Sequence, residues 1–263
     1  MKLRTDLVEK PWGRTAIPPM FDNPDGRRIG EVWFTAGADL PLLLKWLFTS
    51  ERLSVQVHPN DAQAREHGLT RAKTECWYIV DAEPGATIGL GLVRQVREDE
   101  LRGAALDGSI EELLDWRPVA AGEFFIVPPG TIHAIGEGLT LIEFQQNADV
   151  TYRLYDYGRP RELHLDDALA VARRDPYPPE LTTTVGEEPA MLVDGPQFTL
   201  VQGVAGTAPA GALANRLRWV IPLQGRVTSG DEEAGPGECL VVEPQAKLDF
   251  SNARVLIGAE GRI

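Results

Sequence analysis

The chain of 263 residues carries 26 lysines and arginines against 39 aspartates and glutamates, so its formal net charge is −13. This acidic excess argues against a broad nucleic-acid-binding surface, but it leaves room for a small anionic substrate in a locally positive pocket. No apolar run approaches the roughly 20 residues needed to cross a bilayer, and the first residues lack the apolar stretch of a secretory signal. We therefore expect a cytoplasmic protein with no membrane or nucleic-acid partner. Its two cysteines are far apart and do not indicate a disulfide framework.

Many short apolar runs separated by 26 glycines and 20 prolines are typical of an all-β sandwich or barrel. In chain order, we predict strands over residues 28–34, 42–48, 54–58, 75–80, 86–90, 123–127, 139–145 and 151–155. Apolar residues recur at helical spacing between positions 93 and 116, which predicts an inserted helical pair. Short helices are predicted over 61–67 and 164–173.

A proline-rich, acidic stretch over 175–190 predicts a linker. Further strands are expected after it, over 198–204, 217–221, 239–243 and 254–257. The segment 237–244 faintly repeats the segment 122–128, which suggests a reduced copy of the same β-fold. We therefore predict two domains, 1–175 and a smaller one over 190–263. All four histidines precede the linker, so histidine-based chemistry belongs to the first domain.

Two predicted strands carry polar residues at every second position. Alternation puts Ser54, Gln56 and His58 on one face of their strand, and Lys73 and Glu75 on one face of theirs. A half-buried strand with one wet side, or an edge-strand charge pair, would give the same patterns. Lys45, one of only five lysines in the chain, interrupts an apolar strand. A lysine there is costly if buried alone, so it either reaches solvent or meets an anion.

A third segment ends in His133 after a proline–glycine turn. Its spacing, Gly122, five residues, Pro128, one residue, Gly130, two residues and the histidine, matches the second signature of the cupin superfamily. The asparagine that this signature places four residues later is Glu137 here. The candidate metal ligands are then two imidazoles, a carboxylate and an amide, a set that suits zinc, iron or manganese. They are His58, His133, Glu75 and, as the weakest of the four, Gln56.

Together, these segments resemble the type I mannose-6-phosphate isomerases of the cupin superfamily, in their short bacterial form. The similarity covers about residues 10–174, and its motifs are Leu53-Ser-Val-Gln-Val-His-Pro-Asn60, Lys73-Thr-Glu-Cys-Trp-Tyr78, Pro128-Pro-Gly-Thr-Ile-His-Ala-Ile-Gly136, Thr151-Tyr-Arg-Leu-Tyr-Asp156 and Leu163-His-Leu165. The resemblance implies a cupin jelly-roll sandwich with a helical insertion, followed by a smaller, degenerate β-domain without metal.

The resemblance also implies the site. One zinc ion per chain would be bound by Gln56, His58, Glu75 and His133. Arg153 matches the catalytic arginine of the family, Ser54 and Lys73 match residues of its substrate pocket, and Asp149 matches an acidic residue implicated in proton handling. We take Arg153 and Lys73 as catalytic candidates. The substrate-binding candidates are Ser54, Asp149 and, from its place in an apolar strand, Lys45. The implied reaction interconverts mannose 6-phosphate and fructose 6-phosphate by proton transfer between C1 and C2 through an enediol(ate).

Several assignments stay open at this point. The general base is Lys73, Glu143 or Asp149, and Lys73 qualifies only if its pKa is lowered. The phosphate donors are to be found among Ser54, Lys45, Arg153 and either Arg159 or Arg161. Two other classes compete with the isomerase: an iron-dependent cupin oxygenase, in which Gln56 and Lys73 have no evident role, and a non-catalytic sugar-binding or regulatory cupin.

Overall fold

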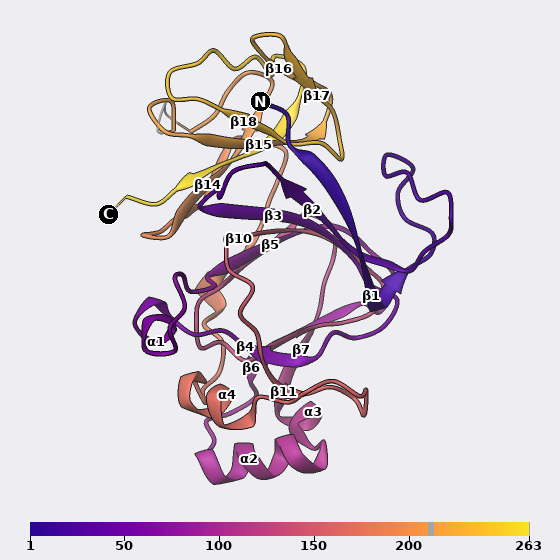
Figure 1. Cartoon of the computed structure of the whole chain (residues 1–263), viewed down its shortest axis with the longest axis vertical. Coiled ribbons are helices and arrows are strands. Elements are labelled where there is room, and N and C mark those ends of the chain that lie inside the picture. Colours follow the sequence, from indigo (N-terminus) through magenta and orange to yellow (C-terminus); the bar gives the residue numbers. More distant parts are fainter. Residues whose placement is uncertain (210–212, 263) are drawn as a thin grey trace.

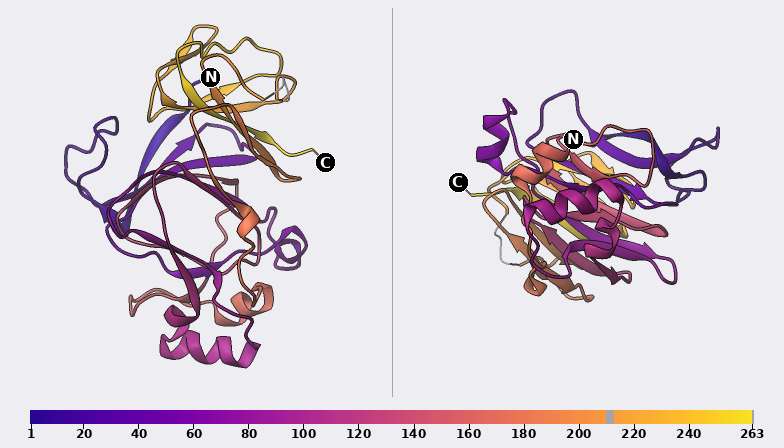
Figure 2. Two further views of the ribbon diagram at one scale, coloured as in Figure 1. Left: turned by 180° about the vertical axis from the view of Figure 1, so that it is seen from behind. Right: turned by 90° about the horizontal axis from the view of Figure 1, so that it is seen from below.

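The computed structural model describes residues 1–209 and 213–262, which form three stacked β-sheets with helices on the outermost one. In Figure 1 the C-terminal sheet lies at the top, a seven-stranded sheet in the middle, and a five-stranded sheet with helices below it. The left view of Figure 2 shows the same order of layers from behind, and the right view, from below, has the helices in front of the sheets. The predicted all-β class is confirmed, and no described helix has the length and apolarity that a membrane span requires.

The two sheets of the N-terminal part are antiparallel throughout. Across the seven-stranded sheet, the order is β1 (Arg4–Arg14), β2 (Ile29–Thr35), β3 (Leu42–Phe48), β10 (Leu139–Gln146), β5 (Glu75–Ala82), β8 (Glu123–Val127) and β12 (Thr182–Thr184). Across the five-stranded sheet, it is β11 (Tyr152–Tyr155), β4 (Val55–Val57), β9 (His133–Ile135), β6 (Thr87–Leu92) and β7 (Leu114–Pro118).

Strand alternation divides the central sheet into two faces of different chemistry. In β10, Ile142 and Phe144 belong to the core shared with the C-terminal sheet, while Leu139 and Leu141 belong to the core shared with the five-stranded sheet. Glu143 therefore lies on the second face, as does Lys45 of β3, because side chains two residues apart point the same way. One end of this inner face is apolar and the other is charged.

Helices cover the outside of the five-stranded sheet. Val55 and Val57 pack there in one core with α2 (Glu98–Asp107), α3 (Ile110–Leu113) and α4 (Leu165–Val171), as the predicted alternation of this strand requires. The inserted helical pair is thus confirmed, although β7 follows it directly, inside the predicted range. The short helix α1 (Asp61–Glu66) begins at Asn60, whose side chain accepts hydrogen bonds from two backbone amides in a capping box.

The C-terminal residues form a sheet ordered β13 (Ala190–Asp194), β14 (Phe198–Val204), β19 (Arg254–Glu260), β15 (Arg218–Gln224) and β18 (Leu240–Val242), plus a hairpin of β16 (Val227–Ser229) and β17 (Glu232–Ala234). This sheet shares a hydrophobic core with the seven-stranded sheet, in which the ring centroids of Phe144 and Phe198 lie 5.2 Å apart. The chain start also bridges the two parts, since Leu3 donates to the carbonyl of Cys239 before β1 joins the other sheet. The division into domains 1–175 and 190–263 stays a prediction.

The predicted linker over 175–190 is wrong for much of its length. It contains the helical turn η1 (Pro179–Leu181) and then β12, whose three threonines pair with the edge of β8. Tyr177 is buried, and its hydroxyl donates to the carbonyl of Ile126 at 2.7 Å, with the carbonyl of Leu181 3.0 Å away. The prolines and acidic residues of this segment indicated an exposed linker. However, β-branched threonines favour strand structure, and the edge of β8 is available to pair with them.

The faint sequence repeat has a structural counterpart. Gly122 and Gly237 both have φ near +86° to +87°, and each precedes a strand, β8 or β18. The glutamate that follows each glycine accepts a hydrogen bond from a backbone amide three residues before it, at 2.8 Å in both cases. The same turn therefore precedes a strand in both segments.

Candidate metal centre and substrate cavity

Three buried side chains converge between the two N-terminal sheets, one from the seven-stranded sheet and two from neighbouring strands of the five-stranded sheet. They are Glu75 at the start of β5, His133 at the start of β9, and His58 directly after β4. One ligand atom from each lies within 4.8 Å of the other two. The carboxylate oxygen Oε1 of Glu75 is 3.2 Å from Nε2 of His133 and 3.7 Å from Nε2 of His58.

Backbone carbonyls set the protonation of both imidazoles. Nδ1 of His58 donates to the carbonyl of Val150 at 2.7 Å, and Nδ1 of His133 donates to that of Thr131 at 2.8 Å. Burial lowers the pKa of His58 to about 3 and also lowers the pKa of His133, so both rings are neutral near pH 7. With the proton on Nδ1, each Nε2 presents a lone pair toward Glu75.

This convergence fits a metal ion. Burial alone would raise the pKa of Glu75, but the ammonium of Lys73 outweighs burial and holds this pKa well below its usual range, so the group is a carboxylate. A carboxylate oxygen and two imidazole lone pairs then face one another without a proton between them, which is repulsive unless a cation lies among them. Two nitrogens and one carboxylate oxygen are a donor set that catalytic zinc sites use.

The fourth expected ligand, Gln56, is in reach but turned the other way. Its Nε2 lies 3.2 Å from Nε2 of His133, and its Oε1 accepts from the hydroxyl of Ser54 at 3.3 Å. An amide nitrogen is a donor and does not bind a metal, so ligation by Gln56 requires rotation of the amide by half a turn. The position of Gln56 therefore suits the expectation, whereas its orientation does not.

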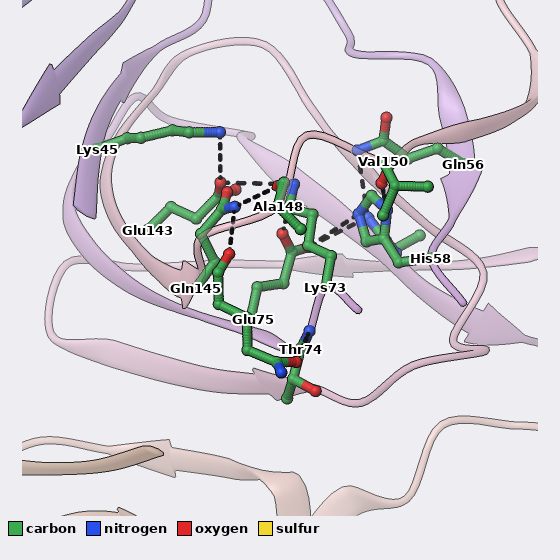
Figure 3. Close-up of polar contacts among 12 residues, drawn as sticks. Lys45, Gln56, His58, Lys73, Thr74, Glu75, Glu143, Gln145, Ala148 and Val150 are labelled. Atoms are coloured by element: carbon green, nitrogen blue, oxygen red, sulfur yellow. Dashed lines mark hydrogen bonds and ion pairs between the residues drawn. The ribbon is translucent and has the colours of Figure 1, made fainter. Parts of the chain in front are cut away.

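A row of alternating charges crosses the inner face of the central sheet beside this cluster (Figure 3). Nζ of Lys73 lies 2.9 Å from Glu75 and 3.6 Å from Glu143, and Nζ of Lys45 lies 3.2 Å from Glu143. Register explains the order, because Lys45 on β3 is directly opposite Glu143 on β10. All four side chains are at most 7% exposed.

The row continues to the edge of the sheet through Glu31 on β2. Its carboxylate accepts from Nε1 of Trp33 at 2.5 Å and lies 3.4 Å from Nζ of Lys10 on β1. Sequence reasoning missed Glu31 and Lys10. The available signal was the one that singled out Lys45, namely a charged residue inside an apolar strand.

Ion pairing changes the expectation for Lys73. Burial alone would lower its pKa, but the carboxylates of Glu143 and Glu75 outweigh burial and raise the pKa. The lowered pKa that a lysine base needs is therefore not found, and the ammonium is charged in this arrangement. Burial raises the pKa of Glu143 despite its two lysine neighbours.

A cavity opens from the charged row toward the surface. Five cationic and three anionic side chains line it: Lys10, Lys45, Lys73, Arg153 and Arg161, with Glu31, Glu143 and Asp149. Ser54 and Gln56 line it as well. Three of the five lysines of a chain with net charge −13 thus face one cavity, which is locally suited to an anion.

Arg153 enters this cavity from the five-stranded sheet. It lies on β11, opposite Gln56 of β4. Its Nη1 donates to the carbonyl of Glu162, and its Nε is buried without a hydrogen-bond partner among residues 1–209 and 213–262. Burial lowers its pKa, with a smaller contribution from Arg161, although an arginine stays charged at neutral pH. Arg153 therefore holds a positive charge with unused donor capacity.

A larger hollow of about 590 Å³ lies elsewhere, around Arg14, Arg28 and Glu83. Its arginines already have partners, because Arg14 contacts Glu83 at 3.1 Å and Arg28 contacts Glu51 at 3.4 Å. The smaller cavity is lined by donors and acceptors, and two of its lining residues, Gln56 and Lys73, contact His133 and Glu75 of the candidate metal centre. We take it as the candidate active site.

The fold and the His–Glu–His cluster define a cupin-like β-sandwich with a candidate metal centre, and comparison with known proteins identifies its relatives. The sequence is 41% identical over 204 residues to a mannose-6-phosphate isomerase of Streptococcus mutans, covering 73% of this chain and 64% of the relative. It is 45% identical to mannose-6-phosphate isomerase ManA of Bacillus subtilis, covering 62% of this chain and 64% of the relative. No protein-family model matches the chain.

Solved structures of mannose 6-phosphate isomerases match the fold of nearly the whole chain. The crystal structure of a mannose 6-phosphate isomerase from Bacillus subtilis matches with a TM-score of 0.80 at 25% identity, covering 98% of each chain. A zinc-bound mannose 6-phosphate isomerase matches with a TM-score of 0.69 at 14% identity, covering 99% of each chain, which supports the fold alone. The resemblance seen in the sequence and the expected cupin fold are confirmed: this chain is a relative of the mannose-6-phosphate isomerases. It spans 64% of the length of the two curated relatives.

Proposed function

We propose that this chain is a zinc-dependent aldose–ketose isomerase that interconverts mannose 6-phosphate and fructose 6-phosphate. The observation that carries the proposal is the convergence of three buried, unprotonated ligand atoms beside a cavity rich in cationic side chains. Its closest support from outside the chain is the name shared by the curated relatives. A sugar phosphate is the proposed small-molecule partner, and a cytoplasmic location is part of the proposal.

The metal would be one zinc ion per chain, held by His58, Glu75 and His133, with the rotated amide of Gln56 as the fourth ligand. When bound, the ion supplies Lewis-acid stabilisation of the negative charge that develops on the substrate oxygens during enolisation. The backbone carbonyls of Val150 and Thr131 would fix both imidazoles through their Nδ1 hydrogens, as partners of this kind do in catalytic zinc sites.

The chain's own residues would move the proton. Isomerisation removes a proton from C2 of the aldose and returns one to C1, so a base must lie within about 3 Å of those carbons' hydrogens. We favour Glu143 among the three candidates. Its burial raises its pKa, and a carboxylate with a raised pKa both accepts and returns a proton more readily near neutral pH. Lys73 is already paired with two carboxylates, and Asp149 is exposed at the rim.

Arg153 would stabilise the enediolate. Its guanidinium keeps its charge and has a buried N–H that is not used within the described residues, so it is available to a developing oxyanion. Lys45 and Ser54, also on the cavity wall, would bind substrate hydroxyl or phosphate oxygens.

The deciding experiment follows conversion of mannose 6-phosphate to fructose 6-phosphate by protein stripped of metal with a chelator and then reloaded with zinc. We expect turnover only after reloading, and incorporation of solvent deuterium at the transferred position in heavy water. Zinc-loaded protein that binds mannose 6-phosphate without turning it over would instead support the non-catalytic sugar-binding cupin and overturn the proposal.

A further inference from the structure

The loop after β11 contains a buried carboxylate that the proposed reaction does not use. Asp156 is 2% exposed, and its two oxygens accept hydrogen bonds from two arginines of the same loop. Arg161 donates from Nε and Nη2, both at 2.6 Å, and Arg159 donates from Nη1 at 3.1 Å. A two-point pair of this kind fixes the plane and direction of the guanidinium as well as its position.

The two arginines bound to Asp156 differ in which of their N–H groups are available to a ligand in the cavity. Arg159 is held away from the cavity and does not line it, since its Nη2 also donates to the carboxylate of Glu51 and to the carbonyl of Arg52. It ties the loop to the residues before β4. Arg161 makes no hydrogen bond beyond Asp156 within the described residues, is 28% exposed and lines the candidate cavity. Its Nη1 edge is therefore open to a ligand.

Arg161 shares the cavity wall with Arg153. Arg161 is close enough to contribute to the lowered pKa of Arg153, after burial. Two guanidinium groups facing one cavity repel each other, and an anion between them would relieve that repulsion. Asp156 binds Arg161 but does not itself line the cavity, so it can orient this group without filling the cavity.

The geometry of the substrate suggests which anion this is. In a hexose 6-phosphate the phosphate lies at the opposite end of the carbon chain from C1 and C2. The reacting carbons must lie beside the metal ligands and Glu143, deep in the cavity, so the phosphate points toward the rim. Lys73 and Lys45 at the deep end already pair with Glu75 and Glu143, whereas Arg161 at the rim has an open donor edge.

We propose that Asp156 is a positioning residue that aims Arg161 into the mouth of the cavity, where Arg161 binds the phosphate group of the substrate. This inference rests on the proposed function for the identity of the substrate. The phosphate binds to Arg161 in both ground and transition states, so the pair acts on affinity, while proton transfer depends on residues at the other end of the cavity.

The test compares Asp156→Asn, Arg161→Met and the double variant with wild type, using zinc-loaded protein. For mannose 6-phosphate, we expect each single variant to raise KM about tenfold, equivalent to about 1.4 kcal/mol, with kcat changed less than about threefold. The inhibition constant of inorganic phosphate should rise by a similar factor. The double variant should resemble Arg161→Met alone, because Asp156 acts through Arg161. Arg161→Lys should recover part of the affinity.

The matched control is Asp115→Asn. Asp115 also accepts two hydrogen bonds from one arginine, Arg117, at 2.9 and 2.7 Å, but it lies on β7 and does not line the cavity. Its loss should leave KM and phosphate inhibition unchanged. A rise in KM for the control as large as that for Asp156→Asn would reduce the effect to general destabilisation and overturn the proposal.

Two other outcomes separate this inference from the proposed function. Unchanged phosphate affinity in Arg161→Met, with wild-type isomerase activity intact, would overturn the role of Arg161 while leaving the isomerase standing. Wild-type protein that binds inorganic phosphate without catalysing isomerisation would remove the proposed function. A weaker phosphate affinity of Arg161→Met, measured directly by calorimetry, would then still support the phosphate site.

Discussion

The buried pair of Lys45 and Glu143 leads to an asymmetric prediction for stability. Lys45→Met removes one of two lysines that contact Glu143, so Lys73 remains 3.6 Å from the carboxylate. Glu143→Gln instead leaves Lys45 with the ring of Trp33, 4.7 Å away, and with no carboxylate within 4 Å in the described chain. Both side chains are 5% exposed, so solvent cannot replace a lost partner.

The expected magnitudes follow from these contacts. Stranding a buried charge costs about 3–5 kcal/mol, which we expect for Glu143→Gln. Lys45→Met should cost about 1–3 kcal/mol, the range for weakening one charge-assisted contact while another remains. The double variant should be less destabilised than the sum of the two by about 0.5–3 kcal/mol, because it removes both charges together.

Urea denaturation of the zinc-loaded single and double variants measures these costs. Lys10→Met is the matched control, since Lys10 pairs with Glu31 at 3.4 Å with its own side chain 29% exposed. Loss of this partly solvated pair should cost no more than about 1 kcal/mol. A larger loss of stability for Lys45→Met than for Glu143→Gln, or strictly additive effects, would refute the account of the charged row.

Other predictions concern turnover, metal removal and packing. Arg153→Ala should lower turnover about 10²–10³-fold while zinc content and melting temperature are retained. Arg153→Lys should recover part of the lost turnover. Wild-type turnover in Arg153→Ala would remove Arg153 from the mechanism. Removing the metal with a chelator should lower the melting temperature of the protein, and added zinc should restore it, because a ligand that binds the native state stabilises that state. An unchanged melting temperature would count against tight zinc binding. Gly136→Ala should destabilise by about 1–3 kcal/mol, since its Cβ would lie 2.1 Å from the carbonyl oxygen of Thr87, whereas Gly37→Ala, with no atom within 4 Å, should not.

Strands with a strong apolar pattern could be predicted from sequence almost to the residue. Leu42–Phe48 and Glu123–Val127 were expected with the bounds that β3 and β8 have, because these runs are apolar and bounded by turns. The strand β1 was missed, since much of Arg4–Arg14 is polar and exposed and contains Pro11. Its place depends on the edge of β2, which is a long-range partner that a local pattern does not contain.

The candidate site shows the same division. Alternation and family resemblance brought Ser54, Gln56, His58 and Glu75 forward, and the structure places them together with His133. What sequence could not supply was register between strands. The pairing of Lys45 with Glu143 needs the alignment of β3 with β10. Likewise, the amide orientation of Gln56 and the arrangement of the arginines around Asp156 depend on side-chain geometry.

Metal content per chain tests the central claim most directly. Elemental analysis of purified wild-type protein, His133→Ala and the control His67→Ala would be read alongside isomerase turnover. His67 is a partly exposed histidine at the end of α1, outside the metal cluster. We expect one zinc per chain and turnover in wild type and in His67→Ala, and we expect His133→Ala to lose both. Full zinc occupancy in His133→Ala, or metal-free wild type that isomerises mannose 6-phosphate at the same rate, would contradict it.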